Sequence, residues 1–307
     1  MEIKNWTYEE YPSFSEEVEG AYRIITSGDE KGTDIFTVEY ANIDGRPLHL
    51  KVIIPQTRNS QNNDNRYPCL VYVQGSAWFE QNISSKLGLL ARLAEKGYVI
   101  AVAEYRHSGI APFPAQAIDI RNAIRFMKIH AKEYKVDVDQ IFVGGDSSGG
   151  HTAMFSQLIQ DDDQSSNLYP VASADVKGII SFYGASSVML EDGMPSTINH
   201  HLPDSPEGLE MGGINLREHP ELCRKMSVEC NIDENTPLPP VLMFHGTKDR
   251  TINPSVSVLI YNKLRNCGKD VQLYLLEGAD HGGSEFWTEE IQKIIINFFS
   301  ECKEKMI

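Results

Sequence analysis

The sequence lacks the features that mark several common classes of protein. It has no run of about 18 apolar residues, so no segment is expected to cross a membrane. Its N-terminus carries no apolar stretch of the signal-peptide kind, so the chain as given is expected to be cytoplasmic, or secreted if a signal was removed. Lys and Arg number 28 against 43 Asp and Glu, and this net charge of −15 argues against nucleic acid or an anionic membrane as a partner.

Cysteine is also sparse, and its spacing excludes two kinds of site. The cysteines are odd in number and include no C-x-x-C pair, so neither a zinc ribbon nor a thioredoxin-like redox site is expected. Scattered cysteines of this kind are typical of free, mostly buried thiols in a reducing compartment. The five are Cys69, Cys223, Cys230, Cys267 and Cys302.

Short apolar runs alternate with amphipathic segments through most of the 307 residues. This alternation predicts the α/β class: one domain over residues 1–307, with a mostly parallel central sheet and helices on both faces. A hairpin precedes it, because 35–40 and 48–54 alternate apolar and polar residues around Asp44-Gly45, and a polar loop follows at 56–66. The later strands are expected at 69–73, 98–103, 141–143, 176–183, 241–244 and 271–276, and the helices at 87–96, 114–132, 256–266 and 289–302.

One stretch interrupts the alternation. Residues 186–240 are rich in Pro, Gly, Glu and His and contain no strand pattern. Loops of this length are commonly functional, and this one falls between two strands at the carboxyl edge of the sheet, where ligands bind in open α/β folds. We therefore expect a short cap-like insertion that helps to wall the pocket.

The most specific motif surrounds Ser147. Gly145 and Gly149 flank this serine in the G-x-S-x-G pattern, after an apolar strand and before a helix-forming segment. Strand, sharp turn and helix in this order are typical of a nucleophile elbow, in which the serine adopts a strained backbone conformation. The amides at the start of the helix then face the place where an oxyanion would form.

A serine nucleophile needs a base, and the base needs an orienting carboxylate. Asp249 follows the apolar run 241–244, and His281 follows the run 271–276, so both stand just after buried strands and in the order that α/β-hydrolases use. The competing residues are less suitable. His151 lies within the helix after the elbow and should point away, His245 should pack beneath the site, and Asp280 is too close to His281 in the chain to share a proton well.

The second part of an oxyanion hole is expected from the loop after an earlier strand. That loop is Gln74-Gly75-Ser76-Ala77-Trp78. We expect the donors to be the amides of Ser76 or Ala77 together with the amide of Ser148. Gln74, Gly75, Trp78 and Asp146 are expected to line the substrate pocket, and the rings of Trp78 and Phe79 to narrow the acyl site.

Several segments resemble the α/β-hydrolase superfamily of carboxylesterases, and more narrowly the hormone-sensitive-lipase-like group and the bifunctional feruloyl and acetyl-xylan esterases. They are Gly145-Asp146-Ser147-Ser148-Gly149-Gly150-His151, Tyr105-Arg106 with Pro112-Phe113-Pro114-Ala115, and His245-Gly246-Thr247-Lys248-Asp249. The resemblance covers roughly Tyr67 to Phe299 and implies an α/β-hydrolase fold. It also implies that Ser147 is the nucleophile, Asp249 the orienting acid and His281 the base.

The chain departs from this group in the oxyanion loop. Gln74 stands where the family usually has His, and Ser76 stands where it has the second Gly. Backbone donors survive a change of side chain, so activity is still expected. What the departure puts in doubt is the family's substrate preference.

These residues predict a serine carboxylesterase that works through an acyl-enzyme and needs no metal and no organic cofactor. The resemblance implies short-chain esters, such as acetyl or feruloyl esters of plant polysaccharide fragments, so the expected partner is a small ester or an acylated oligosaccharide. The oligomeric state stays open. Two alternatives are an arylformamidase-type amide hydrolase and a catalytically silent hydrolase-fold binding protein, the second disfavoured because all three triad candidates are retained.

Overall fold

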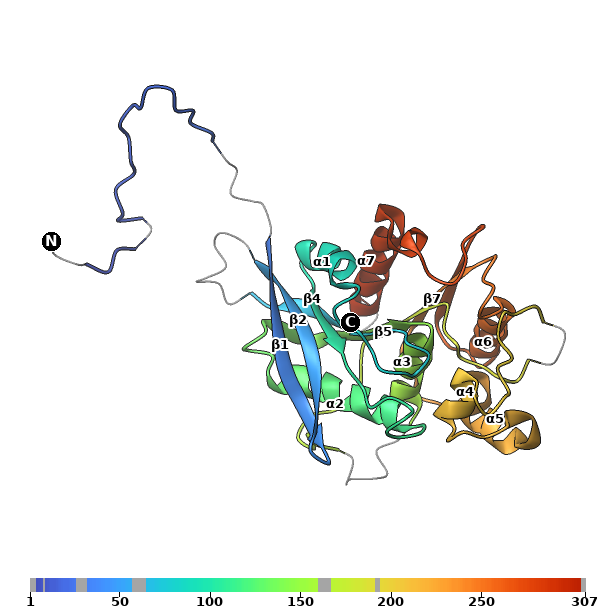
Figure 1. Ribbon diagram of the computed structural model, residues 1–307. Coiled ribbons are helices and arrows are strands. Elements are labelled where there is room, and N and C mark those ends of the chain that lie inside the picture. Colours follow the sequence, from blue (N-terminus) through green and yellow to red (C-terminus); the bar gives the residue numbers. More distant parts are fainter. Residues whose placement is uncertain are drawn as a thin grey trace.

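An eight-stranded sheet forms the centre of the protein, here a computed structural model (Figure 1). The structure describes residues 4–7, 9–25, 32–56, 65–159, 167–190 and 194–304. The strands are β1 (Gly32–Ile43), β2 (Arg46–Gln56), β3 (Tyr67–Val73), β4 (Val99–Ala103), β5 (Val136–Asp146), β6 (Ile179–Phe182), β7 (Val241–Gly246) and β8 (Val271–Leu276). Their order across the sheet is β1-β2-β4-β3-β5-β6-β7-β8.

The sheet is mostly parallel, as the sequence predicts. Only β1, β2 and β4 form antiparallel pairs, and the strands from β3 to β8 pair in parallel. The hairpin between β1 and β2 turns at Asp44 and Gly45, whose φ angles are 53° and 79°. Two successive left-handed residues give a turn whose twist matches that of the strands, which explains the Asp-Gly pair. The polar loop predicted at 56–66 lies mostly outside the described residues.

Helices cover both faces of the sheet (Figure 1). Successive residues of β3 alternate between two cores, one shared with α1 and α7 and the other with α2, α3 and α6. The α/β class is thus confirmed; the clearest difference is that β5 begins at Val136 rather than Ile141. The helices are α1 (Leu87–Glu95), α2 (Ala115–Ile129), α3 (Ser148–Leu158), α6 (Ser255–Asn266) and α7 (Glu289–Glu304). Among the described residues, no helix has the length and apolar character to span a bilayer.

The described part of the insertion at 186–240 contains short helices and no strand. Its 3₁₀ turn η4 contacts α3 and α6, and Figure 1 shows α4 and α5 together at that side of the sheet. Hydrogen bonds tie it to the body: for example, His151 Nε2 lies 2.9 Å from the carbonyl of Met226, and the amide of Phe113 donates to the carbonyl of Glu210 at 2.8 Å. Its elements are α4 (Pro206–Glu210), η3 (Leu216–Glu218), α5 (Pro220–Met226) and η4 (Val228–Asn231).

Gly149 in α3 packs directly against β3. A Cβ atom at this position would lie 2.0 Å from the carbonyl oxygen of Val73, whereas one at Gly88 in α1 would meet nothing within 4 Å. We expect Gly149→Ala to lower the free energy of unfolding by about 3 kcal/mol or more, because backbone cannot move aside. Gly88→Ala is the control and should raise it by up to about 1 kcal/mol, since alanine favours helix. Equal effects in denaturant titrations would contradict this packing.

His151 is completely buried where α3 meets the insertion. Burial lowers the pKa of His151 to about 4, against about 6.5 for a histidine in an unfolded chain. Between these values the unfolded chain binds the proton more strongly, so stability is full above about pH 6.5 and is lost as the pH falls toward 4.

Replacing His151 should therefore flatten the response to acid. We expect the free energy of unfolding of wild type to fall by about 3 kcal/mol more than that of His151→Gln between pH 7 and pH 4. His219→Gln, at an exposed histidine, is the control and should follow wild type. If the free energy of unfolding falls with pH equally in wild type and His151→Gln, the buried His151 ring does not cause the loss of stability in acid.

Candidate active site

Ser147 stands at the sharp turn between β5 and α3. Its φ is 53°, a left-handed conformation that is strained for a residue with a side chain. The surrounding backbone holds it there: its amide donates to Phe182 at 2.9 Å, and its carbonyl accepts from Ala185 at 3.1 Å. The flanking glycines are required, because a Cβ at Gly145 would lie 2.4 Å from the carbonyl oxygen of Gly149.

The structure brings Ser147, His281 and Asp249 together in a continuous hydrogen-bonded chain. His281 Nε2 lies 2.9 Å from Ser147 Oγ, and His281 Nδ1 lies 2.7 Å from Asp249 Oδ2. The three residues follow β5, β7 and β8, whose carboxyl ends meet at one edge of the sheet. In this arrangement, His281 can accept the proton of the Ser147 hydroxyl, and the carboxylate of Asp249 can stabilise the positive charge that His281 then carries.

The carboxylate of Asp249 has no exposed side-chain surface. One oxygen accepts from the amides of Thr251 and Ile252 at 2.9 and 2.8 Å. The other accepts from His281 and also from His245 Nε2 at 3.1 Å. Burial alone would raise the pKa of Asp249, but the hydrogen bonds from the two histidines outweigh it and hold the pKa far below its usual range. The carboxyl group is therefore ionised at neutral pH.

The competing acid and bases have other partners. His151 bonds to the insertion, as described above, and Asp280 pairs with Arg250 and accepts from the amide of His281 rather than from its ring. His245 does pack beneath the site, fixed by Ser257 Oγ at 2.6 Å. Its direct contact with the Asp249 carboxylate is a feature that the sequence analysis missed. A signal was present in the sequence: His245 stands at the end of its strand, four residues before Asp249, so the loop between them can bring the two side chains together.

The oxyanion loop differs in part from expectation. The amide of Ser76 already donates to Ser148 Oγ at 3.0 Å, which leaves it unavailable to a ligand. Among the described residues, the amides of Ala77 and Ser148 donate to no protein group. Of the predicted donors, Ala77 and Ser148 are therefore the two that could bind an oxyanion.

Asp146 holds this loop in place. It is 3% exposed and accepts hydrogen bonds from Tyr72 at 2.6 Å and from the amide of Gly75 at 3.1 Å. Lys86 forms an ion pair with its second oxygen, to which the Tyr183 hydroxyl also donates. Burial and the nearby Asp146 charge raise the pKa of Tyr183, so its phenol stays protonated and remains a donor.

An open hollow of about 610 Å³ surrounds the Ser147 hydroxyl. Lys86 is its only lysine or arginine within the described residues, and sequence reasoning missed it. A signal was present in the sequence, because Lys86 is the N-cap of α1. The helix dipole disfavours a cation at that position, so a lysine there suggests an acidic partner elsewhere in the fold. The hollow is lined by Gly75, Ser76, Ala77, Lys86, Leu89, Asp146, Ser147, Tyr183, Thr251, His281, Gly282, Gly283, Ser284 and Trp287.

Two of the four expected pocket residues lie elsewhere. Gly75 and Asp146 border the hollow, but Gln74 and Trp78 do not. Trp78 is 1% exposed, and its ring packs edge-on against His151 with centroids 5.1 Å apart. The left-handed backbone at Trp78, with a φ of 57°, directs the ring into the core instead of toward the serine. Phe79 is 42% exposed and does not line the hollow, so neither ring narrows it.

Known proteins share this arrangement of strands and helices. A truncated carbohydrate esterase from gut microbiota superposes with a TM-score of 0.72 at 22% identity, covering 90% of this chain and 98% of the other. The thermophilic esterase Est2 of Thermogutta terrifontis gives 0.68 at 22% identity, with 87% and 94% covered. These likenesses confirm the α/β-hydrolase fold that the sequence resemblance implies.

Sequence comparison leads to the same group. Esterase LipC of Mycobacterium tuberculosis is 28% identical over 218 residues, which are 70% of this chain and 53% of LipC. The chain thus spans about half the length of that relative. The BD-FAE family model matches residues 57–264, from the segment before β3 to Leu264 in the last turn of α6. Since this match includes more than half of the sequence, the chain belongs to the BD-FAE family.

Proposed function

We propose that this protein is a serine carboxylesterase in which Ser147, His281 and Asp249 form the catalytic triad. The observation that carries the proposal is the unbroken chain of hydrogen bonds of 2.9 and 2.7 Å that ends at a serine in an open hollow. Relatives named as esterases support the reaction class. Acyl transfer is the chemistry that a serine activated in this way performs.

The mechanism follows from the positions of the atoms. Ser147 Oγ attacks the ester carbonyl while His281 Nε2 takes its proton, and the buried Asp249 charge stabilises the imidazolium that forms. The amides of Ala77 and Ser148 donate to the oxyanion of the tetrahedral intermediate. His281 then protonates the leaving alcohol. Water then attacks the acyl carbonyl while His281 takes its proton, and His281 returns this proton to Ser147 Oγ as the bond from Oγ to the acyl carbon breaks and the acid leaves.

The proposed substrates are short-chain esters, with acetyl or feruloyl esters of plant polysaccharide fragments as the natural class. Leu89 and Trp287 supply an apolar wall of the hollow, which suits an acyl group, and Lys86 and Ser284 supply polar groups, which suit the hydroxyl groups of a sugar. A structural relative described as a carbohydrate esterase supports this class.

Replacing the nucleophile gives the first test. We expect Ser147→Ala to lower kcat/KM for 4-nitrophenyl acetate by about 10⁴-fold or more, because no other group in the site replaces the attacking oxygen. Ser300→Ala, at an exposed serine on α7, is the matched control and should behave as wild type. Activity that survives in Ser147→Ala would exclude this residue as the nucleophile.

A series of leaving groups and acyl chains tests the substrate class. Wild type should hydrolyse 4-nitrophenyl acetate faster than the butyrate, and the octanoate slower by about tenfold or more, because a long chain outgrows the apolar wall. Acetylated xylo-oligosaccharides should release acetate. Faster cleavage of an N-formyl arylamine than of any ester would instead identify an amide hydrolase.

A further inference from the structure

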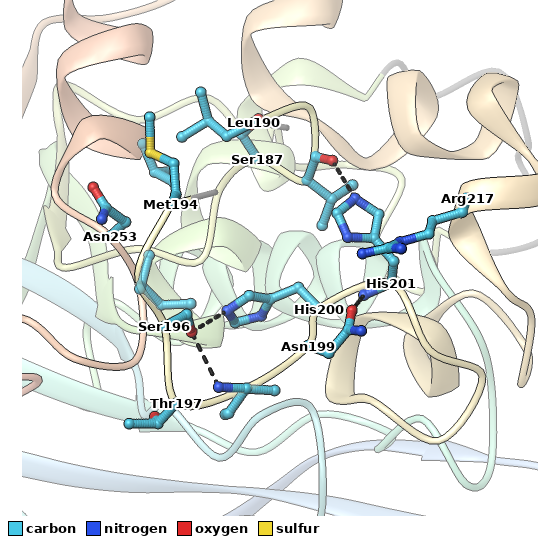
Figure 2. Close-up of a pocket in the computed structure, with 14 residues that line it drawn as sticks. Ser187, Leu190, Met194, Ser196, Thr197, Asn199, His200, His201, Arg217 and Asn253 are labelled. Carbon is cyan, nitrogen blue, oxygen red and sulfur yellow. Dashed lines mark hydrogen bonds between the residues drawn. The ribbon is translucent and has the colours of Figure 1, made fainter. Parts of the chain in front are cut away.

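The insertion contains a second histidine–carboxylate pair, near the triad but outside it. His200 Nδ1 lies 2.8 Å from Glu207 Oε1, and the two side chains are 20% and 4% exposed. On its other side, His200 Nε2 lies 3.0 Å from both Ser196 Oγ and the carbonyl oxygen of Thr251. Figure 2 shows Ser196 and His200 joined in this way at the edge of a cavity of about 330 Å³.

Serine, histidine and glutamate in this order resemble a catalytic triad, but the protons are arranged differently. The Thr251 carbonyl can only accept, so His200 Nε2 must carry a proton in order to bond to it. Ser196 Oγ donates to the same carbonyl at 2.8 Å. Burial would lower the pKa of His200, but Glu207, the Thr251 carbonyl and the Asp249 charge together raise it. His200 is thus a donor on both sides and offers no lone pair to activate Ser196.

The residue that His200 holds also holds the proposed catalytic acid. Thr251 bonds to His200 through its carbonyl and to Asp249 through its amide, at 3.0 and 2.9 Å. The insertion grips the neighbouring residue too, because the amide of Thr197 donates to the carbonyl of Arg250 at 2.7 Å. A short hydrogen-bonded path therefore runs from α4 through His200 to the Asp249 carboxylate.

Two further titratable side chains line the cavity beside His200. His201 and Arg217 line the same cavity (Figure 2), and His201 Nε2 bonds to the carbonyl of Val188 at 3.0 Å. Among the described residues, the side chains of His200 and Ser196 donate to the Thr251 carbonyl.

We propose that His200, held by Glu207, is a positioning residue for Asp249, so that docking of the insertion sets the geometry of the catalytic acid. The proposal rests on the proposed function, in which Asp249 orients His281. When the insertion is docked, His200 fixes the peptide group between Thr251 and Ile252 by its carbonyl, and the N–H of that group, which belongs to Ile252, points at the carboxylate. When it is not, the loop loses a buried partner and the acid loses part of its support.

Two substitutions of the same residue separate the contacts of His200. In His200→Asn, the side-chain nitrogen takes the position of Nδ1 and cannot reach the Thr251 carbonyl. In His200→Gln, the side-chain nitrogen takes the position of Nε2 and still donates to this carbonyl. With 4-nitrophenyl acetate we expect His200→Asn to lower kcat by about 10- to 100-fold and to change KM less than about threefold, because a misplaced acid impairs proton transfer rather than binding. His200→Gln should stay within about fivefold of wild type.

His219→Asn is the matched control. His219 lies in the same insertion and pairs with Glu221 at 3.2 Å, but the two side chains are 44% and 68% exposed. We expect this variant to keep the kcat of wild type. Equal losses in the Asn and Gln variants of His200, or no loss in His200→Asn, would overturn the positioning role.

Amide hydrogen exchange supplies a readout that does not depend on activity. The amides of Thr251 and Ile252 should exchange faster in His200→Asn than in His219→Asn, and unchanged protection would overturn the proposal. If His200→Asn does not fold, Glu207→Gln compared with Glu221→Gln should give the same direction of change. An inactive wild type, or an active Ser147→Ala, would refute the proposed function, while the exchange result would still decide whether His200 holds the loop.

Discussion

The buried carboxylate of Asp249 is the interaction on which the rest of the site depends. A carboxylate without solvent is stable only when donors surround it, and here four do: the rings of His281 and His245 and the amides of Thr251 and Ile252. These donors come from β7, from the loop after it and from the loop after β8. Satisfying one charge thus requires that β7 and β8 pair in the correct register.

A second buried acid organises the opposite side of the serine. Asp146 receives the amide of Gly75, the ammonium of Lys86 and the hydroxyl of Tyr183, and so fixes the oxyanion loop relative to the elbow. The Tyr183 ring also packs edge-on against His281, with centroids 4.8 Å apart. Tyr183 therefore contacts both Asp146 and the histidine that is bound to Asp249, and Ser147 lies between two buried carboxylates.

The sequence was sufficient for features that depend on pattern and chain order. Alternating strands and helices define the sheet, and Asp249 could be selected because a carboxylate directly after a buried strand reaches the carboxyl edge. The sequence was insufficient where the backbone conformation determines the direction of a side chain or an amide. Trp78 was expected in the pocket and Ser76 as an amide donor, yet a left-handed turn buries the first and a serine hydroxyl occupies the second. The role of His200 depends on a contact between segments 51 residues apart in the chain, which no local pattern encodes.

The insertion differs from the sheet in how well its buried groups are satisfied. Both carboxyl oxygens of Glu210 are buried without a hydrogen-bond partner among the described residues, and burial raises the pKa of this group well above its usual range. A neutral, unpartnered acid of this kind costs roughly 1 to 3 kcal/mol, whereas the charge of Asp249 is fully compensated. Local stability is therefore lower in α4 than in the sheet, and regions of low stability open first. Because α4 also carries Glu207, the partner of His200, opening of α4 would release His200 and, through the proposed positioning role, loosen the loop that supports Asp249. No residue of the insertion lines the hollow at Ser147 in the described part of the chain, so the insertion would act on the acid rather than on the wall of the pocket.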